Sequence, residues 1–268
     1  MREISIEESK SIMIKILESI DKCCRENNIE YSLCWGTMIG AIRHHGFIPW
    51  DDDIDLTMSR DDYNRFLEVY NDEKYGVYTP KKNNNCIQII TKIFDKRTCV
   101  YYNNYPKTLY GIWVSIFPYD IVPDKNVKLW EIKRFFWTFL YQSKTSRFLT
   151  SNPLKKRVVK VIMKGLLLPF SAISLYNRLE DCLTAYNGHH TKRVCIWTGV
   201  GASKTTFLYF SKEWFDKCLD VDFEGLKVRI IKGYDSLLKS RYGNYMEFPP
   251  ESERVPKHDY KAYYLENV

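Results

Sequence analysis

The stretch WGTMIGAIRHHGFIPWDDDIDL, residues 35–56, contains the most informative pattern in the chain. Its four aspartates fall within five positions, and the last two, Asp53 and Asp55, alternate with Ile54 and Leu56. This alternation is the period of a half-buried strand. The two carboxylates are therefore predicted to project from one face of the strand, while the two apolar side chains enter the core on the other.

Two carboxylates held a few ångströms apart on a rigid element repel each other. Such a pair is tolerated mainly where a divalent cation lies between them or where one carboxylate takes up a proton. Hard oxygen ligands suit Mg²⁺ or Mn²⁺, and Mg²⁺ bound by carboxylates usually completes its shell with water and phosphate oxygens. The pattern thus indicates a metal site for a phosphate-bearing substrate, although an Asp-rich run is by composition alone also typical of a solvated turn or a helix cap.

A strand, a turn and a helix precede the aspartates. Tyr31–Trp35 is apolar and predicts a short strand, Gly36 and Thr37 follow as a turn, and Met38–Arg43 predicts the first turns of a helix. Free backbone N–H groups at such a helix start bind anions. A strand over Asp53–Met58 would return its carboxylates to this turn, so the phosphate cradle and the metal ligands are expected in one small α/β unit.

Local patterns predict three further elements. Ser59 is the expected N-cap of a helix that ends at about Tyr70. Residues Glu7–Glu26 carry an apolar stripe at helical spacing and are expected to pack on the sheet, and Gln88–Phe94 is predicted to be a strand.

The order Gly-[Ser/Thr], helix, Asp-hydrophobic-Asp-hydrophobic resembles the nucleotidyltransferase (polymerase-β-like) superfamily. The fuller string GTMIGAIRHHGFIPWDDDIDL resembles the LicD family of phosphotransferases within that superfamily. Gly111–Asp120 (GIWVSIFPYD) resembles the second block of the family, and Arg241–His258 (RYGNYMEFPPESERVPKH) resembles its closing block. Three blocks in the order of the family, over residues 35–258, make a specific match, which a lone Asp-x-Asp would not.

This resemblance implies a chemistry. LicD-like enzymes transfer a phosphorylated alcohol, typically phosphocholine from CDP-choline, to a hydroxyl of a cell-surface or teichoic-acid-type glycan and release CMP. The resemblance also implies that Asp53 and Asp55 bind the metal ion and that Gly36 and Thr37 contact the donor phosphates. Two alternatives remain: a nucleotidyltransferase that makes a CDP-alcohol from CTP, and a catalytically weakened relative that acts as a binding protein.

One position departs from the family pattern. The family usually carries a third metal-site aspartate in its second block, where this chain has Ser115. Either Asp120 or Asp51 is expected to supply the missing carboxylate, unless Ser115 holds a water in its place or the site is weakened. A third carboxylate would act as general base on the acceptor hydroxyl or complete the shell of a second ion.

Three cationic residues are candidates for binding the donor. Arg43 ends the helix that starts at the anion site, and its fork matches phosphate oxygens, but it also suits a helix C-terminus. Arg254 could likewise bind phosphate or have only a structural role, and its position in the segment that resembles the closing block favours binding of the donor. Lys92 lies in a predicted strand and could reach the donor, although an exposed strand lysine is the simpler expectation.

The resemblance implies an α/β (α+β) fold with a mixed, nucleotidyltransferase-like sheet flanked by helices. The chain has 268 residues, of which 45% are hydrophobic, and it shows no linker or internal repeat. We expect one LicD-like catalytic domain over residues 1–268, with a core at about 1–122 and 190–268 and a helical insertion at about 123–189.

The predicted insertion is rich in aromatic and basic residues between about Val127 and Arg178. Its apolar run, Gly165–Tyr176, is too short to cross a bilayer. Basic residues beside an apolar helix suit peripheral contact with a membrane, which could present a lipid-linked acceptor. The alternative is a buried helical lid over the active site with a solvated basic face.

The eight cysteines show no metal-binding spacing, and Met1–Lys10 has no apolar signal core. We therefore expect reduced thiols and a cytoplasmic protein, possibly at the inner face of the membrane. A nucleic-acid partner is not expected despite the net charge of +7, because the sequence has no stacking or groove-reading motif.

Overall fold

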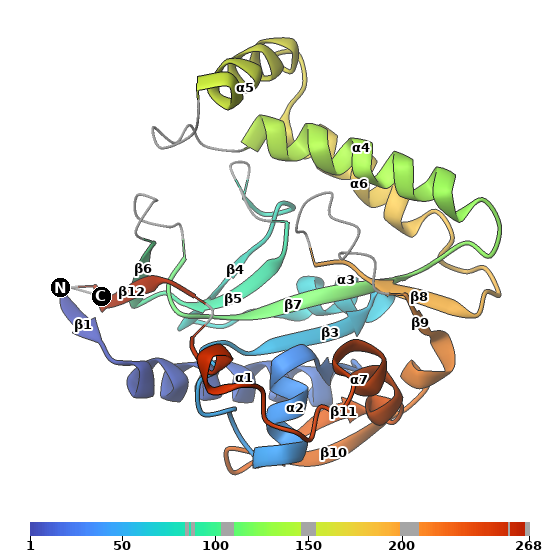
Figure 1. The fold of residues 1–268 in the computed structure, drawn as a ribbon. Helices are drawn as coiled ribbons and strands as arrows, with labels where there is room; N and C mark the ends of the chain where they lie inside the picture. The colour runs from blue at the N-terminus through green and yellow to red at the C-terminus, as the bar shows by residue number, and fades with distance from the viewer. Residues whose placement is uncertain are drawn as a thin grey trace.

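A computed structural model describes residues 1–83, 86, 89–102, 110–145, 154–198, 209–256 and 258–265; the side chains of residues 154–157 are not described. The helices are α1 (Ile6–Glu26), α2 (Trp35–His44), α3 (Arg60–Val69), α4 (Val127–Thr145), α5 (Leu154–Leu166), α6 (Ala172–Thr184) and α7 (Tyr234–Tyr242), with short 3₁₀-helices η2 (Lys212–Phe215) and η3 (Glu251–Glu253) (Figure 1). The strands are β1 (Arg2–Ile4), β2 (Ser32–Leu33), β3 (Asp55–Ser59), β4 (Tyr75–Tyr78), β5 (Thr91–Asp95), β6 (Thr98–Tyr102), β7 (Trp113–Ile121), β8 (Arg193–Ile196), β9 (Tyr209–Ser211), β10 (Cys218–Phe223), β11 (Leu226–Ile231) and β12 (Tyr260–Tyr264).

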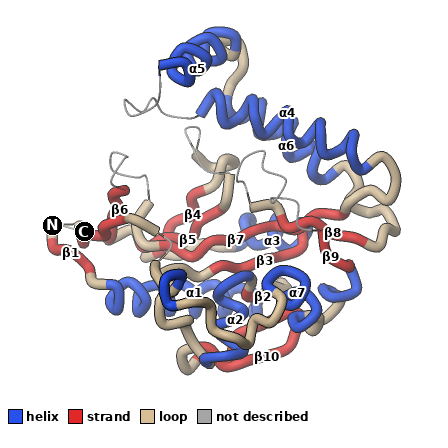
Figure 2. Tube along the Cα trace, in the orientation of Figure 1, coloured by secondary structure: helices blue, strands red, loops and turns tan. Residues whose placement is uncertain are grey.

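The main sheet has the order β2–β3–β7–β5–β4, and β8 and β9 extend it beside β7. Strands β3 and β7 are parallel, whereas the other described pairs of this sheet are antiparallel. A second sheet, β1–β12–β6, brings the two ends of the chain together, and β10 and β11 form a hairpin (Figure 2). This mixed sheet with flanking helices confirms the predicted fold class.

Local sequence signals explain where two of the helices begin. Helix α1 starts with a capping box, in which the Ser5 side chain accepts from the Glu8 N–H and the Glu8 carboxylate accepts from the Ser5 N–H. The Ser59 hydroxyl accepts from the Asp62 N–H at the start of α3, as the sequence predicted for an N-cap.

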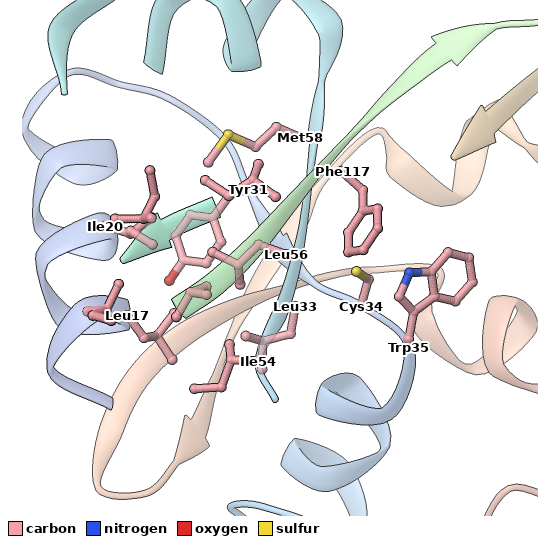
Figure 3. Packing of buried hydrophobic residues seen from close by; sticks show 14 of the residues in the cluster. Leu17, Ile20, Tyr31, Leu33, Cys34, Trp35, Ile54, Leu56, Met58 and Phe117 are labelled. Atoms are coloured by element: carbon pink, nitrogen blue, oxygen red, sulfur yellow. The ribbon is translucent and has the colours of Figure 1, made fainter. Parts of the chain in front are cut away.

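The core forms between α1 and the sheet. Ile54 and Leu56 are fully buried, and they point, with Met58, toward Leu17 and Ile20 of α1 (Figure 3). Burial of each such side chain stabilises the fold by about 1.5–3 kcal/mol. The predicted alternation is therefore confirmed on its apolar side, and Asp55, between Ile54 and Leu56, faces the opposite side of the sheet.

The boundaries near the aspartates differ from the prediction. Strand β3 begins at Asp55 rather than Asp53, since its ladder starts where the Cys34 N–H donates to the Asp55 carbonyl, at 2.9 Å. Helix α2 begins at Trp35, so that Gly36 and Thr37 form its first turn instead of a separate turn before it. Strand β5 covers the later part of the strand predicted from Gln88, which lies outside the described residues.

Helices α4, α5 and α6 occupy the segment predicted as a helical insertion. Trp130 and Tyr141 of α4 share a second buried cluster with Leu175 and Leu179 of α6, separate from the main core. The two helices lie side by side above the sheet, and α5 lies beyond them (Figure 1). The division of the chain into a core and an insertion stays a prediction about its folding units.

A buried ion pair connects α3, β7 and α6. The Arg60 guanidinium donates to both oxygens of Asp120, at 2.9 and 2.5 Å, and to Glu180 at 3.1 Å. The side chains of Arg60 and Asp120 are 6% and 1% exposed. Burial disfavours the charged guanidinium, but Asp120 more than offsets this cost and raises the pKa of Arg60.

Substitution Asp120→Asn is expected to lower the free energy of unfolding by about 3–5 kcal/mol, because it leaves Arg60 charged and buried without its main partner. Urea unfolding followed by circular dichroism measures the loss. The exposed control Asp222→Asn should change stability by less than about 0.5 kcal/mol. An equally small change for Asp120→Asn would show that the ion pair contributes nothing to the fold.

Candidate active site

Three neighbouring strands place one polar residue each in a row. Asp55 of β3 is paired with Ser115 of β7, which is paired in turn with Lys92 of β5. The Ser115 side chain hydrogen-bonds to the Asp55 carboxylate, and both Ser115 and Lys92 are buried. The predicted site therefore has a row of three polar groups across the sheet, on the side opposite to Ile54 and Leu56.

Three consecutive aspartates lie just before β3. Asp51, Asp52 and Asp53 each offer a carboxylate oxygen, and these oxygens lie within 4.8 Å of one another. Asp55 interacts electrostatically with both Asp51 and Asp53. The structure thus brings Asp53 and Asp55 together, as predicted, and adds Asp51, one of the two residues expected to supply a third carboxylate.

The first turn of α2 is built around these carboxylates. A Cβ atom on Gly36 would lie 2.6 Å from Oδ2 of Asp51, so any larger residue would displace that carboxylate from its observed position. The Thr37 hydroxyl accepts from the Asp55 N–H at 3.0 Å and ties the helix start to β3. Thr37 is itself buried, so its hydroxyl holds the two elements in register.

The same helix start has the features of an anion site. Its N-cap, Cys34, provides no side-chain hydrogen bond to the first turn. Trp35 adopts a φ of 52°, in the left-handed region, which costs a residue with a bulky side chain about 1–2 kcal/mol. This strained entry places the N-terminal end of the helix, with its partial positive charge, beside the carboxylates.

The crowded carboxylates have altered acidities. Burial, and then the charges of Asp53 and Asp52, raise the pKa of Asp51 to about 7. Burial raises the pKa of Asp53, and burial together with Asp53 raises that of Asp55 well above its usual value. The Oδ2 atom of Asp51 is buried and has no hydrogen-bond partner among the described residues. These hard oxygen donors fit a divalent cation, which would satisfy the unpartnered oxygen and reduce the repulsion.

His258 is a site residue that the sequence analysis did not single out. Its ring Nδ1 and backbone N–H both bond to Asp52, at 2.9 and 3.0 Å, and its Nε2 lies 3.8 Å from Asp53. Burial lowers the pKa of His258, but the bond to Asp52 and the charge of Asp53 more than offset this and raise it. One indication in the sequence that His258 belongs to the site was its position at the end of the segment that resembles the closing block of the family.

Lys92 is buried rather than exposed on its strand. Its ammonium lies 3.8 Å from the ring centroid of Trp113 and 5.1 Å from that of Tyr110. Burial lowers its pKa to about 7, and Asp55 and Asp53 oppose this shift. The expectation that Lys92 is a surface lysine is therefore wrong, and its amine faces the carboxylate cluster.

Arg43 and Arg254 both bind the closing segment. Arg43 donates to the carbonyls of Tyr245 and Glu247, at 2.7 and 3.0 Å, and Arg254 donates to that of Pro249 at 2.8 Å. The two guanidiniums also lie over the ring of Phe248. These contacts explain how the segment is held, and a role for either arginine with donor phosphates stays a prediction.

Asp120 does not join the cluster, which corrects the prediction that it could supply the third carboxylate. It lies five residues along β7 from Ser115, and its oxygens are bound by Arg60 and by the Asn187 side chain. The odd number of residues also places it on the opposite face of the strand from Ser115.

Millimolar Mg²⁺ is expected to raise the unfolding midpoint of this protein, because a cation bound only by the folded state stabilises it by about 2.7 kcal/mol at a hundredfold excess over Kd. Asp53→Asn and Asp55→Asn should abolish the increase, and the exposed Asp222→Asn should retain it. Thermal unfolding with EDTA or with added MgCl₂ provides the comparison. A shift of the same size in all four proteins would place the cation elsewhere.

Metal-free protein is expected to lose stability between about pH 5 and pH 7. The folded-state pKa of Asp51 is raised from 3.8 to about 7, so in this range the folded state holds a proton that the unfolded state has released. The free energy of unfolding then falls by at most about 1.4 kcal/mol per pH unit for this group. Urea titrations in EDTA should show a smaller fall for Asp51→Asn, and parallel curves for the two proteins would contradict the assignment.

Comparisons with known proteins identify the family of this chain. Residues 28–173 match the family described as LicD/FKTN/FKRP, nucleotidyltransferase domain. The lipopolysaccharide cholinephosphotransferase LicD of Haemophilus influenzae is 31% identical over 279 aligned residues, which cover 99% of this chain and all of that protein. Uncharacterized proteins of Rickettsia typhi and Rickettsia prowazekii are 27% and 26% identical over 143 and 133 residues, or 50% and 45% of this chain and 44% and 48% of theirs. The chain therefore belongs to the LicD/FKTN/FKRP nucleotidyltransferase family and is a LicD-type phosphotransferase.

Proposed function

We propose that this protein transfers phosphocholine from CDP-choline to a hydroxyl group of a cell-surface glycan and releases CMP. The observation that carries the proposal is the acidic cluster beside the N-terminus of α2, where carboxylate oxygens of Asp51, Asp52 and Asp53 lie within 4.8 Å of one another and Asp55 interacts electrostatically with Asp51 and Asp53. The full-length similarity to a lipopolysaccharide cholinephosphotransferase supports phosphocholine as the transferred group and a lipopolysaccharide-type glycan as the acceptor.

The reaction exchanges one P–O bond for another. The acceptor oxygen forms a bond to the choline-bearing phosphorus, and the bond from this phosphorus to the bridging oxygen of the pyrophosphate breaks. The electron pair leaves with CMP, and the hydroxyl proton passes to a base. Asp53 and Asp55, with Asp51, are our candidates for holding Mg²⁺ or Mn²⁺, which when bound would neutralise charge on the pyrophosphate linkage.

The chain offers its own groups for the donor phosphates. The N–H groups of the first turn of α2, at Gly36 and Thr37, carry partial positive charge toward the carboxylate cluster. Lys92, in the same row of the sheet as Asp55 and Ser115, would add a cation when it is protonated. We assign both to positioning the donor and to stabilising charge as CMP leaves.

His258 is our candidate for the base that receives the acceptor proton. Asp52 bonds to its Nδ1 and orients the ring, so that Nε2 is directed toward Asp53. An imidazole held by a carboxylate in this way can accept a proton from a bound hydroxyl. Ser115, which bonds to Asp55, would orient that carboxylate instead of adding a ligand of its own.

The free cysteines of this protein fit the reducing compartment in which a nucleotide-activated donor would be found. None of its eight cysteines forms a disulfide in the part of the chain that the structure describes. We therefore place the reaction in the cytoplasm, where thiols stay reduced and nucleotide-activated alcohols would be the donors.

The direct test is release of CMP from CDP-choline in the presence of Mg²⁺ and a lipopolysaccharide acceptor. Asp53→Asn and Asp55→Asn are expected to reduce kcat by about 10³-fold, because each removes a carboxylate that binds the ion and so several kcal/mol of transition-state stabilisation. Asp222→Asn, an exposed aspartate on β10, is the matched control and should keep the wild-type rate.

Each contrary outcome is informative. Equal rates in the wild type and both site variants would end the proposal of a carboxylate-dependent transferase. Release of pyrophosphate from CTP, with no CMP from CDP-choline, CDP-ribitol or CDP-glycerol, would identify a nucleotidyltransferase that makes the CDP-alcohol. CMP release from CDP-ribitol or CDP-glycerol alone would keep the chemistry and replace the alcohol.

A further inference from the structure

Exposed apolar side chains are concentrated on α4 and α5. Of the twenty large hydrophobic residues that are exposed in the described part of the chain, twelve lie between residues 129 and 170. These twelve, which we call the α4–α5 surface, are Leu129, Ile132, Phe135, Phe136, Phe139, Val158, Val159, Val161, Ile162, Leu166, Leu168 and Phe170. Single exposed apolar residues are ordinary, whereas a group of this size marks an interaction site.

Helix α4 has two apolar faces, and only one of them is buried. Trp130 and Tyr141 pack in the cluster shared with α6. Leu129, Ile132 and Phe136 follow each other at spacings of three and four residues, so they share another face, and they are 53%, 64% and 50% exposed. A helix that is apolar on both faces is expected to be covered on both. The described residues of this chain leave the second face uncovered.

Helix α5 is amphipathic with its apolar side outward. Val158, Ile162 and Leu166 recur every four residues and are exposed, whereas Lys160 and Lys164 lie on the other side of the helix and are half-buried. An amphipathic helix of a globular protein normally turns its apolar stripe to the core. The reversed orientation here suits a helix that lies at an apolar boundary outside the protein.

The charge around this surface is strongly one-sided. Residues 127–170 contain ten lysines and arginines and one acidic residue, Glu131, which gives a formal charge of +9. Because the whole chain carries +7, the remainder carries −2. The positive charge of the protein therefore belongs to the segment that exposes the apolar residues.

We propose that the α4–α5 surface docks on an anionic lipid bilayer. The apolar side chains would enter the boundary between headgroups and acyl chains, and the positive charge of the segment would attract it to the anionic headgroups. A second copy of this chain could cover the apolar area, but two segments that each carry a formal charge of +9 would repel each other. The phosphates of a nucleic acid would interact with the positive charge, but a nucleic acid would leave the aliphatic side chains uncovered. The proposal does not depend on the proposed reaction.

Within the described ranges, no helix combines the length and the apolarity needed to span a bilayer. Peripheral contact with a membrane was one of two interpretations of this segment from its sequence, and a buried lid was the other. The outward orientation of the apolar residues favours the first.

Flotation of the full-length protein with vesicles tests the proposal. We expect binding to vesicles of phosphatidylglycerol and phosphatidylcholine, little binding to phosphatidylcholine alone, and a decrease with added salt. Two double variants, Phe136→Ser with Phe139→Ser and Val159→Ser with Ile162→Ser, are each expected to weaken binding by about tenfold or more. Val69→Ser with Leu219→Ser is the matched control, because these residues are 44% and 43% exposed but lie on α3 and β10.

The other possible results show whether a lipid bilayer or a second copy of the chain covers the α4–α5 surface. Vesicle binding that is absent, or equal in the wild type and both α4–α5 variants, would overturn the proposal. Sedimentation as a dimer that the same variants dissociate, without vesicle binding, would assign the surface to a second copy. Asp53→Asn should bind vesicles like the wild type whatever its activity, so failure of the proposed reaction leaves this test intact. Unchanged thermal unfolding of the variants would show that they are folded.

Discussion

Mutual repulsion among buried carboxylates is the constraint on which the rest of this site depends. Asp51, Asp53 and Asp55 all have raised pKa values, first because they are buried and then because of the charges of neighbouring aspartates, which include Asp52. An arrangement of this kind costs stability in the metal-free protein, and a fold keeps it only where something compensates. The protein supplies Lys92 and His258 from within the chain, and among the described residues one oxygen of Asp51 has no hydrogen-bond partner.

The backbone at the start of α2 is closely fitted to that carboxylate cluster. Gly36 gives Asp51 its space, and Thr37 holds the start of β3 through the Asp55 N–H. The strained entry at Trp35 orients the helix N-terminus toward the carboxylates. The features that we propose to bind phosphate and metal are therefore parts of one structural unit, as catalysis by positioning and electrostatics would require.

Charge divides the molecule into two regions with different tasks. The sheet holds a concentration of acid beside a buried lysine, whereas the segment over residues 127–170 carries +9 and exposes apolar side chains. The buried pair of Arg60 and Asp120, with Glu180, connects the sheet to α6 of the helical region. The proposed donor site and the proposed lipid-binding surface would together place the enzyme where a lipid-linked acceptor could reach it.

Patterns along the chain were sufficient for the α/β class, for the core side of β3 and for the family, because these depend on periodicity and on local motifs. Periodicity identifies the face on which a side chain lies, but it does not identify the groups opposite that face. Asp120 was expected among the ligands and instead pairs with Arg60, while Lys92, expected on the surface, is buried against Trp113. His258 reaches Asp52 across more than two hundred residues. Those contacts arise from chain packing between distant segments, and so they became visible only when the strands and helices were placed in space.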